Sequence, residues 1–345
     1  MSQSFQTKCP ARRPVSVWEL PKLTTSVHAF RRATVSSPKL RPHFVKILAF
    51  VCRNRFAIAD QIQRRFPKYL KSDRTARRHL AEMETLGVLG VQPVNGVSPL
   101  MPKVFFVTAA GLRCLRRAYE QNGVAIQPFA RERRRTEGHS FPHVFHELAI
   151  TEFLIAVREA VAERHDLELL IDERRSLVSH PAFRVTLAGR RTRLRPDALF
   201  QFRQIGGGSM CCFVEIDNGS ETERQLAAKL RRYRVWGESE RGSDFLSALY
   251  RKAAATRVRP VFRVLFVCCY TDPDTTARRE KLIARVASRQ PGKIASCLWT
   301  TTQHRLTASD QQTPGLLSPI WMRVRSKDST SAGLVPRLCL FPDKE

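Results

Sequence analysis

The chain has 345 residues, of which 59 are Lys or Arg and 31 are Asp or Glu, and its formal net charge is +28 at pH 7. This length favours two domains, and a hydrophobic fraction of 43% is enough for packed cores, which excludes a wholly disordered chain. The sequence contains no apolar run of 18 residues, so we expect no membrane partner, and the excess positive charge predicts a polyanionic one, most commonly nucleic acid.

Nine cysteines are scattered along the sequence without a Cys-x-x-Cys pair. Most of them lie in apolar runs, which is typical of buried, reduced thiols and not of a zinc site or a disulfide framework. The first thirty residues also lack the apolar segment of a secretory signal. We therefore expect a cytoplasmic protein.

The first 122 residues divide into an arm and a folded unit. Residues 1–40 are polar, basic and rich in proline, so we expect a flexible arm. Residues 41–122 show the spacing of three helices, a β-hairpin and a fourth helix. This order is that of a winged helix-turn-helix domain, whose third helix enters the major groove of DNA.

The expected third helix covers residues 73–85 and has one apolar and one basic side. Ser72 precedes it and can cap its N-terminus. The basic side carries Arg74, Arg77 and Arg78. We therefore expect this to be the recognition helix and these arginines to contact DNA. The alternative is a generic helical bundle with a solvated basic face.

The rest of the chain predicts a second domain. A charged run at 123–138 is interpreted as a linker. Between 139 and 302 helix and strand patterns alternate, which fits a three-layer α/β sandwich around a mixed sheet. The predicted fold class is thus α/β (α+β), with an N-terminal winged helix followed by this sandwich. We expect residues 303–345 to be mostly irregular. Strands are expected at 167–172, 183–187, 197–203, 210–217, 261–270 and 294–300.

Three acids and a lysine can meet at one edge of the predicted sheet. Glu215 and Asp217 lie two residues apart at the end of a strand, so they share one of its sides. If that strand pairs with the one before it as a hairpin, Asp197 comes close to the same end. Lys229 lies on the apolar stripe of the following helix, where it must meet a carboxylate or reach solvent. We expect these residues to form a catalytic site, with Asp197 and Glu215 binding Mg²⁺.

The motifs around these acids resemble a known nuclease superfamily. Pro196-Asp197, followed after an apolar strand by Glu-x-Asp at 215–217, is similar to the PD-(D/E)XK pattern, in which acids hold Mg²⁺ and a lysine orients or activates water. The resemblance implies that Asp197 and Glu215 are the two acids. Asp217 stands where that pattern has its lysine, and Lys229 is the candidate for a lysine that has moved to the next helix.

A closer resemblance covers roughly residues 41–300. It is carried by His-Glu-Leu at 146–148, Arg-Pro-Asp-Ala at 195–198, Phe-Val-Glu-Ile-Asp-Asn-Gly-Ser-Glu at 213–221 and Lys-Leu-Arg-Arg-Tyr at 229–233. With the expected winged helix, these motifs are similar to the replication-relaxation family. Members are associated with plasmid replication and the relaxation of plasmid DNA. The resemblance implies a mobile-element DNA protein whose partners are DNA and replication or mobilisation proteins.

The sequence leaves several interpretations of the site open. The acids fit metal-dependent cleavage of DNA, a degenerate nuclease fold in a non-catalytic DNA-binding or transcriptional regulatory protein, or surface ion pairs. Arg193 and Arg195 end an arginine run that leads into Asp197, so we expect them to contact phosphates, with a solvated loop as the alternative. No Gly-x-x-x-x-Gly-Lys-[Ser/Thr] sequence occurs, which argues against ATP-driven action.

Overall fold

The chain is a mixed α+β protein. The computed structural model describes residues 40–92, 102–121, 141–174, 180–205, 207–252, 262–270, 272–291, 294–303, 321–324 and 334–338. The expected linker at 123–138, and all of the expected arm except residue 40, lie outside these ranges.

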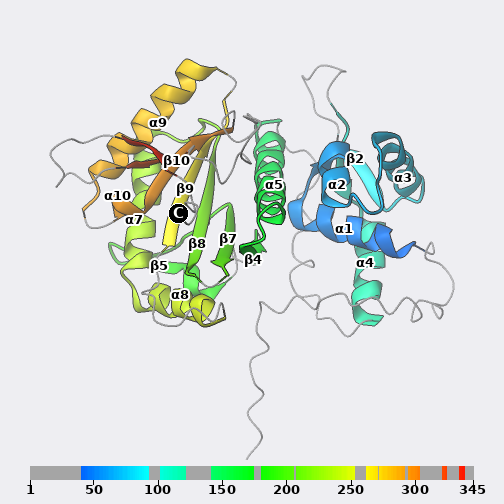
Figure 1. Ribbon diagram of the computed structural model, residues 1–345, viewed down its shortest axis with the longest axis horizontal. Coiled ribbons are helices and arrows are strands. Elements are labelled where there is room, and N and C mark those ends of the chain that lie inside the picture. Colours follow the sequence, from blue (N-terminus) through cyan, green and yellow to red (C-terminus); the bar gives the residue numbers. More distant parts are fainter. Residues whose placement is uncertain are drawn as a thin grey trace, which may run out of the picture.

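The N-terminal part of the chain consists of helices around a small sheet (Figure 1). In chain order its elements are α1 (Pro42–Asn54), β1 (Ala57–Ile58), α2 (Ala59–Arg65), α3 (Asp73–Thr85), β2 (Leu89–Gln92), β3 (Val104–Val107) and α4 (Ala109–Gln121). Strand β3 lies between β1 and β2 and runs antiparallel to both. The three helices, the strand pair and the fourth helix therefore occur in the order that the sequence predicts.

Helix α3 forms where its local signals predict it. The Ser72 hydroxyl accepts a 3.2 Å hydrogen bond from the Thr75 amide and so satisfies one of the free donors at the start of the helix. On the apolar side, Ala76, Leu80 and Met83 are fully buried against α1 and the small sheet. The helix is thus fixed by its core side, and its opposite side is exposed.

The C-terminal part is built around a larger sheet. Its elements are α5 (Phe141–Ala162), β4 (Leu167–Glu173), a 3-10 turn η3 (Pro181–Phe183), β5 (Arg184–Leu187), β6 (Arg190–Arg193), β7 (Ala198–Gln204), β8 (Ser209–Asp217), α7 (Glu223–Gly237), α8 (Glu240–Lys252), β9 (Phe262–Cys268), α9 (Pro273–Ser288), α10 (Ile294–Cys297), β10 (Leu298–Thr302), β11 (Trp321–Val324) and β12 (Leu334–Leu338). Within the described residues its strand order is β12-β11-β10-β9-β8-β7-β4. Strands β8, β9 and β10 are parallel and their outer neighbours antiparallel, so the sheet is mixed, as expected.

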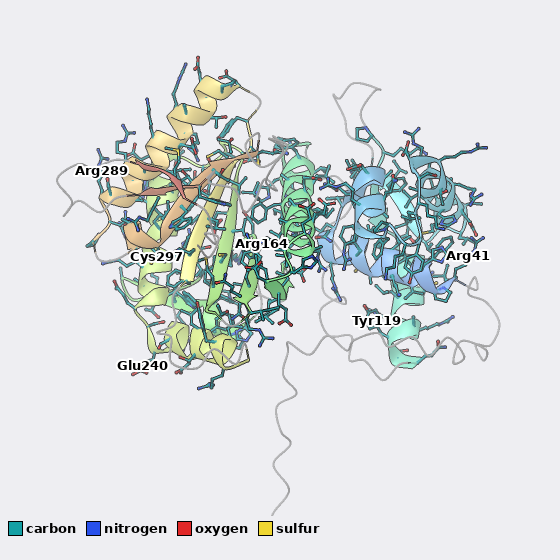
Figure 2. All side chains as sticks on the ribbon, in the orientation of Figure 1. Arg41, Tyr119, Arg164, Glu240, Arg289 and Cys297 are labelled. Atoms are coloured by element: carbon teal, nitrogen blue, oxygen red, sulfur yellow. The ribbon has the colours of Figure 1, made fainter. Side chains whose placement is uncertain are left out.

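Helices cover both faces of this sheet. Because side chains alternate along β8, Cys211 and Phe213 pack on the α7–α9 side, whereas Cys212 and Val214 pack on the α5 side. At the outer surface of the α7–α9 layer, Arg289 donates a 2.8 Å bond to Glu223 (Figure 2). The result is the three-layer arrangement that the alternating pattern predicts.

Helix α5 also joins the two parts of the chain. Figure 1 shows it between the sheet and the N-terminal helices. Arg64 on α2 donates to Glu152 at 2.5 Å and to Glu159 at 2.9 Å, both on α5. The buried Arg174, just past β4, donates to Glu147 on α5 and, at 2.8 Å, to the Asn54 carbonyl at the end of α1. Even with α5, the described part of the chain contains no helix long and apolar enough to cross a membrane.

The structure corrects or adds to the sequence prediction in three places. Arg190–Arg193 is a strand, β6, and it pairs with β5 in a separate two-stranded sheet. The sequence predicts a strand at 294–300, but the first half of this prediction is wrong. Ile294–Cys297 forms helix α10, and Ile294 packs into the core beside α9. Strands β11 and β12 lie in the segment expected to be mostly irregular, and they extend the larger sheet.

Candidate functional site

The first acid, Asp197, is anchored at the junction of β7, β8 and α5. Ala198 pairs with Val214, and the Asp197 amide donates to the Val214 carbonyl at 3.0 Å, so the hairpin forms as predicted. Oδ2 of Asp197 accepts a 2.8 Å bond from the Ile216 amide. His146 Nε2 lies 3.3 Å from the same oxygen and 3.1 Å from the Ile216 carbonyl. A single imidazole nitrogen thus ties Asp197 to the end of β8.

These contacts shift the pKa values of Asp197 and His146 and so determine the charge of both side chains. Burial acts to raise the pKa of Asp197, but the His146 contact and the positive charge of Lys229 outweigh it and hold that pKa below its ordinary value. Burial acts to lower the pKa of His146, but Asp197 outweighs burial and raises it. The pair therefore favours an ionised Asp197 beside a protonated His146.

The second acid, Glu215, is buried with a lysine and a tyrosine. Its side chain is 1% exposed. Oε2 accepts a 2.8 Å bond from Lys229 Nζ, and Oε1 accepts a 2.5 Å bond from the Tyr233 hydroxyl. Lys229 and Tyr233 are four residues apart on α7, so one side of that helix supplies both donors. Lys229 Nζ also lies 2.8 Å from Glu221 Oε1.

One ammonium group is therefore shared by several carboxylates. Burial disfavours a charged Lys229, but Glu215, Asp197 and Glu221 together raise its pKa, and it stays protonated. Burial raises the pKa of Glu215 to about 7, and the negative charge of Asp197 adds to this rise against the opposing effects of Lys229 and Tyr233. The site thus concentrates negative charge around a single lysine.

The third acid, Asp217, is held by a different partner. It shares a side of β8 with Glu215, as expected, but Arg279 on α9 donates to it twice, from Nε to Oδ2 at 2.5 Å and from Nη2 to Oδ1 at 2.8 Å. The Gly219 amide donates to Oδ1 at 3.3 Å. Asp217 therefore anchors α9 to the sheet edge, while Asp197, Glu215 and Lys229 form the cluster beside it.

The expected DNA contacts lie in two places. Arg74, Arg77 and Arg78 are exposed on α3, which Figure 1 shows on the far side of α5 from β8. Arg193 is half-buried in β6, and Arg195 is exposed two residues before Asp197. The second pair thus directly precedes Asp197 in the chain, whereas the α3 arginines lie apart from the acidic cluster.

Two further residues of the site, His146 and Tyr233, are not identified as site residues by local sequence patterns. His146 is quoted in the His-Glu-Leu resemblance, but its contact with Asp197 crosses from α5 to the sheet. Tyr233 belongs to an apolar stripe, and its hydroxyl is directed to Glu215. The spacing Lys229-x-x-x-Tyr233 is the one sequence signal for this pair. Among the described residues, no group of three His, Cys, Asp or Glu side chains is arranged to hold a metal ion.

Comparison with known proteins identifies the family of this chain. A sequence model of the replication-relaxation family matches residues 48–244, from α1 into α8, a range that contains Asp197, Glu215 and Lys229. No match was found among curated proteins or among solved structures. Because the matched residues make up more than half of the chain, the protein belongs to the replication-relaxation family.

Proposed function

We propose that this protein binds duplex DNA in the replication or relaxation of a plasmid or another mobile element, with α3 as its main contact. The family supports this biological setting. The observation that carries the proposal is the exposed basic side of α3, with Arg74, Arg77 and Arg78, on a helix whose other side is buried. Three helices followed by a strand pair are the elements of a winged helix-turn-helix domain, which presents its third helix to the major groove.

The charges on α3 are available to a polyanion. Arg77 pairs with Asp73 one turn earlier, with Nη2 and Oδ2 2.6 Å apart, but both side chains are more than half exposed. Such a pair contributes little to stability, so phosphate can compete for the guanidinium. The net charge of +28 favours the same encounter at long range.

The test is a comparison of two charge-matched triple variants. R74Q/R77Q/R78Q removes three charges from α3, and R278Q/K281Q/R285Q removes three exposed charges from α9. With a labelled duplex in a fluorescence anisotropy titration near 0.15 M salt, we expect the α3 variant to bind about 10- to 100-fold more weakly, because three phosphate contacts are lost. The α9 variant should bind nearly as well as wild type. Equal losses in both variants would remove α3 from the interface.

A second candidate function is Mg²⁺-dependent nicking of the bound DNA. It is favoured by one arrangement: Asp197 and Glu215 lie at the same end of paired strands, and Lys229 Nζ is 2.8 Å from Glu215. The side chains of Asp197, His146 and Lys229 are 19%, 23% and 18% exposed, so solvent reaches the cluster from the outside.

The residues of the cluster suit Mg²⁺ chemically. The ion commonly takes one or two carboxylates and completes its shell with water and phosphate oxygens. Asp197 and Glu215 would supply those carboxylates, and the repulsion between them, which contributes to the raised pKa of Glu215, would be relieved by a divalent cation. When bound, such an ion would polarise the scissile phosphate. Lys229 and His146 would hold the two acids in place, and Glu215 would have to share an oxygen that now accepts from Lys229 or Tyr233.

The ion pairs of the same cluster also support a non-catalytic role. Each acid has a cationic partner: Asp197 has His146, Glu215 has Lys229, and Asp217 has Arg279. A network of this kind can stabilise the sheet edge of a protein that only binds DNA. The two candidates differ in one result, which is whether Mg²⁺ produces nicks that depend on Asp197 and Glu215.

A further inference from the structure

The β5–β6 hairpin is a small two-stranded ribbon whose charged residues are all positive. Residues 181–195 contain five arginines and neither Asp nor Glu. The arginines are Arg184, Arg190, Arg191, Arg193 and Arg195. Among the strands that the structure describes, these two pair only with each other and not with the larger sheet. The hairpin therefore presents a separate, strongly basic surface.

The strand register places three arginines, Arg184, Arg191 and Arg193, on the outer side of the ribbon, whereas Arg190 pairs with Leu187 on the other face. Arg184 pairs with Arg193 and Thr186 pairs with Arg191, and directly opposed residues share a face. Arg184, Thr186 and Arg191 are exposed. The other face carries Val185, which is buried in the core against α7 and the sheet.

The hairpin is held firmly at both ends. Its two-residue loop, Ala188–Gly189, has positive φ at both positions, 46° and 75°, as in the tight turns whose twist matches that of paired strands. At the base, the Leu194 amide donates to the Phe183 carbonyl at 2.9 Å, and both side chains are buried. The outer arginines are thus carried on an ordered support.

Three exposed arginines of the ribbon, Arg184, Arg191 and Arg195, form no ion pair within the described ranges. Arg184 lies directly opposite Arg193, so two like charges face each other across the ribbon. Like charges in that position destabilise a strand pair. A polyanion across the outer face would remove this repulsion.

We propose that the outer face of the β5–β6 ribbon binds the phosphate backbone of duplex DNA and leads it to the acidic cluster. This inference rests on the proposed DNA binding and adds a second contact surface to it. A two-stranded ribbon fits the major groove, and guanidinium groups bind phosphate oxygens in pairs. Arg195 lies two residues before Asp197, which limits their separation along the chain to about 7 Å. DNA bound by the ribbon therefore passes beside Asp197, Glu215 and Lys229.

The experiment measures how affinity for a labelled duplex changes with salt. The R184Q/R191Q/R195Q variant removes three exposed charges from the ribbon, and the α9 variant R278Q/K281Q/R285Q is the matched control. We expect the ribbon variant to bind roughly 10-fold more weakly or worse, and the slope of log affinity against log salt to fall by about 2 to 3, because each phosphate contact contributes about 0.9 to that slope. The control should keep the wild-type slope. Circular dichroism verifies folding, and the single variant R191Q, near the turn, replaces the triple if the triple does not fold, with an expected loss in slope of about 1.

The possible results separate this inference from the proposed function. A wild-type chain that binds no duplex contradicts both. An α3 variant that loses binding, beside a ribbon variant with the wild-type slope, leaves the proposed function intact and overturns the ribbon. Polyglutamate serves as the probe for an acidic protein partner. If the ribbon variant loses affinity for polyglutamate but not for the duplex, the ribbon binds protein and the inference is wrong.

Discussion

Lys229 on α7 donates a 2.8 Å hydrogen bond from Nζ to Oε2 of Glu215, which is almost fully buried at the end of β8. The position two residues after Glu215 is Asp217, so the cation of this site comes from the next helix and not from the strand. Its removal leaves a buried carboxylate with Tyr233 as its remaining donor. The stability of this end of β8 therefore depends in part on Lys229.

Lys229→Met should lower the free energy of unfolding by about 3 kcal/mol, because it removes one partner of a buried ion pair and leaves the other. Urea unfolding measures this change. The exposed Lys281 on α9 gives the control Lys281→Met, which should change stability by about 0.5 kcal/mol or less. The double variant Lys229→Met/Glu215→Gln should recover part of the loss. A Lys229→Met protein as stable as the control would contradict the importance of this pair.

The titration of Glu215 should make the free energy of unfolding depend on pH. Its pKa rises from 4.5 to about 7 in the folded state, so between these values the folded chain holds a proton that the unfolded chain has released. This group must therefore make the protein less stable as the pH rises from about 4.5 to 7, by about 3 kcal/mol in all, with no further change above that range. The measurement compares unfolding free energies of wild type and Glu215→Gln from pH 5 to 8. Wild type should lose stability relative to the variant over that range, and a constant difference would show that Glu215 titrates normally.

The contact between α2 and α5 should depend on Arg64. This residue donates to both Glu152 and Glu159, with a side chain that is 32% exposed. Arg64→Gln should reduce stability by about 1 kcal/mol, since solvent screens part of the interaction. It should also speed hydrogen exchange of the α2 amides. The exposed Lys68 gives the control Lys68→Gln, and equal exchange in the two variants would argue that packing alone holds α2 on α5.

Nicking of supercoiled plasmid by wild type in Mg²⁺ should be lost in Asp197→Asn and Glu215→Gln. The exposed Asp274 on α9 provides the control Asp274→Asn, which should nick like wild type. Gel electrophoresis of the open-circular product measures the reaction, and EDTA should abolish it. Nicks that survive both substitutions would exclude this cluster as the site. The absence of nicks in wild type with Mg²⁺ would favour the non-catalytic DNA-binding candidate.

Local patterns predict the parts of the structure that local forces determine. The cap at Ser72 and the apolar spacing of α3 identify that helix, and apolar runs identify β7 and β8. The pairing that brings Asp197 to Glu215 is a condition of the sequence interpretation, and the structure shows it. Strand β6 is not predicted, because Arg190–Arg193 has no apolar alternation and is ordered by pairing with β5.

The partners of the acids depend on contacts that are distant in sequence. Arg279 lies 62 residues after Asp217, and His146 approaches Asp197 from a helix on the other face of the sheet. No spacing rule joins residues so far apart. In contrast, Lys229 and Tyr233 are one turn apart on α7, so their shared direction could be predicted once Glu215 was placed.

The most direct test of a DNA function is photo-crosslinking from α3 itself. A photoreactive amino acid is introduced in place of Arg78, and in a matched protein in place of Arg278 on α9; both positions are exposed. Irradiation with a labelled duplex should yield a covalent protein–DNA product from position 78 and little or none from position 278. Absence of the product at position 78, or equal yields from both positions, would contradict the assignment of α3 as the DNA-binding helix.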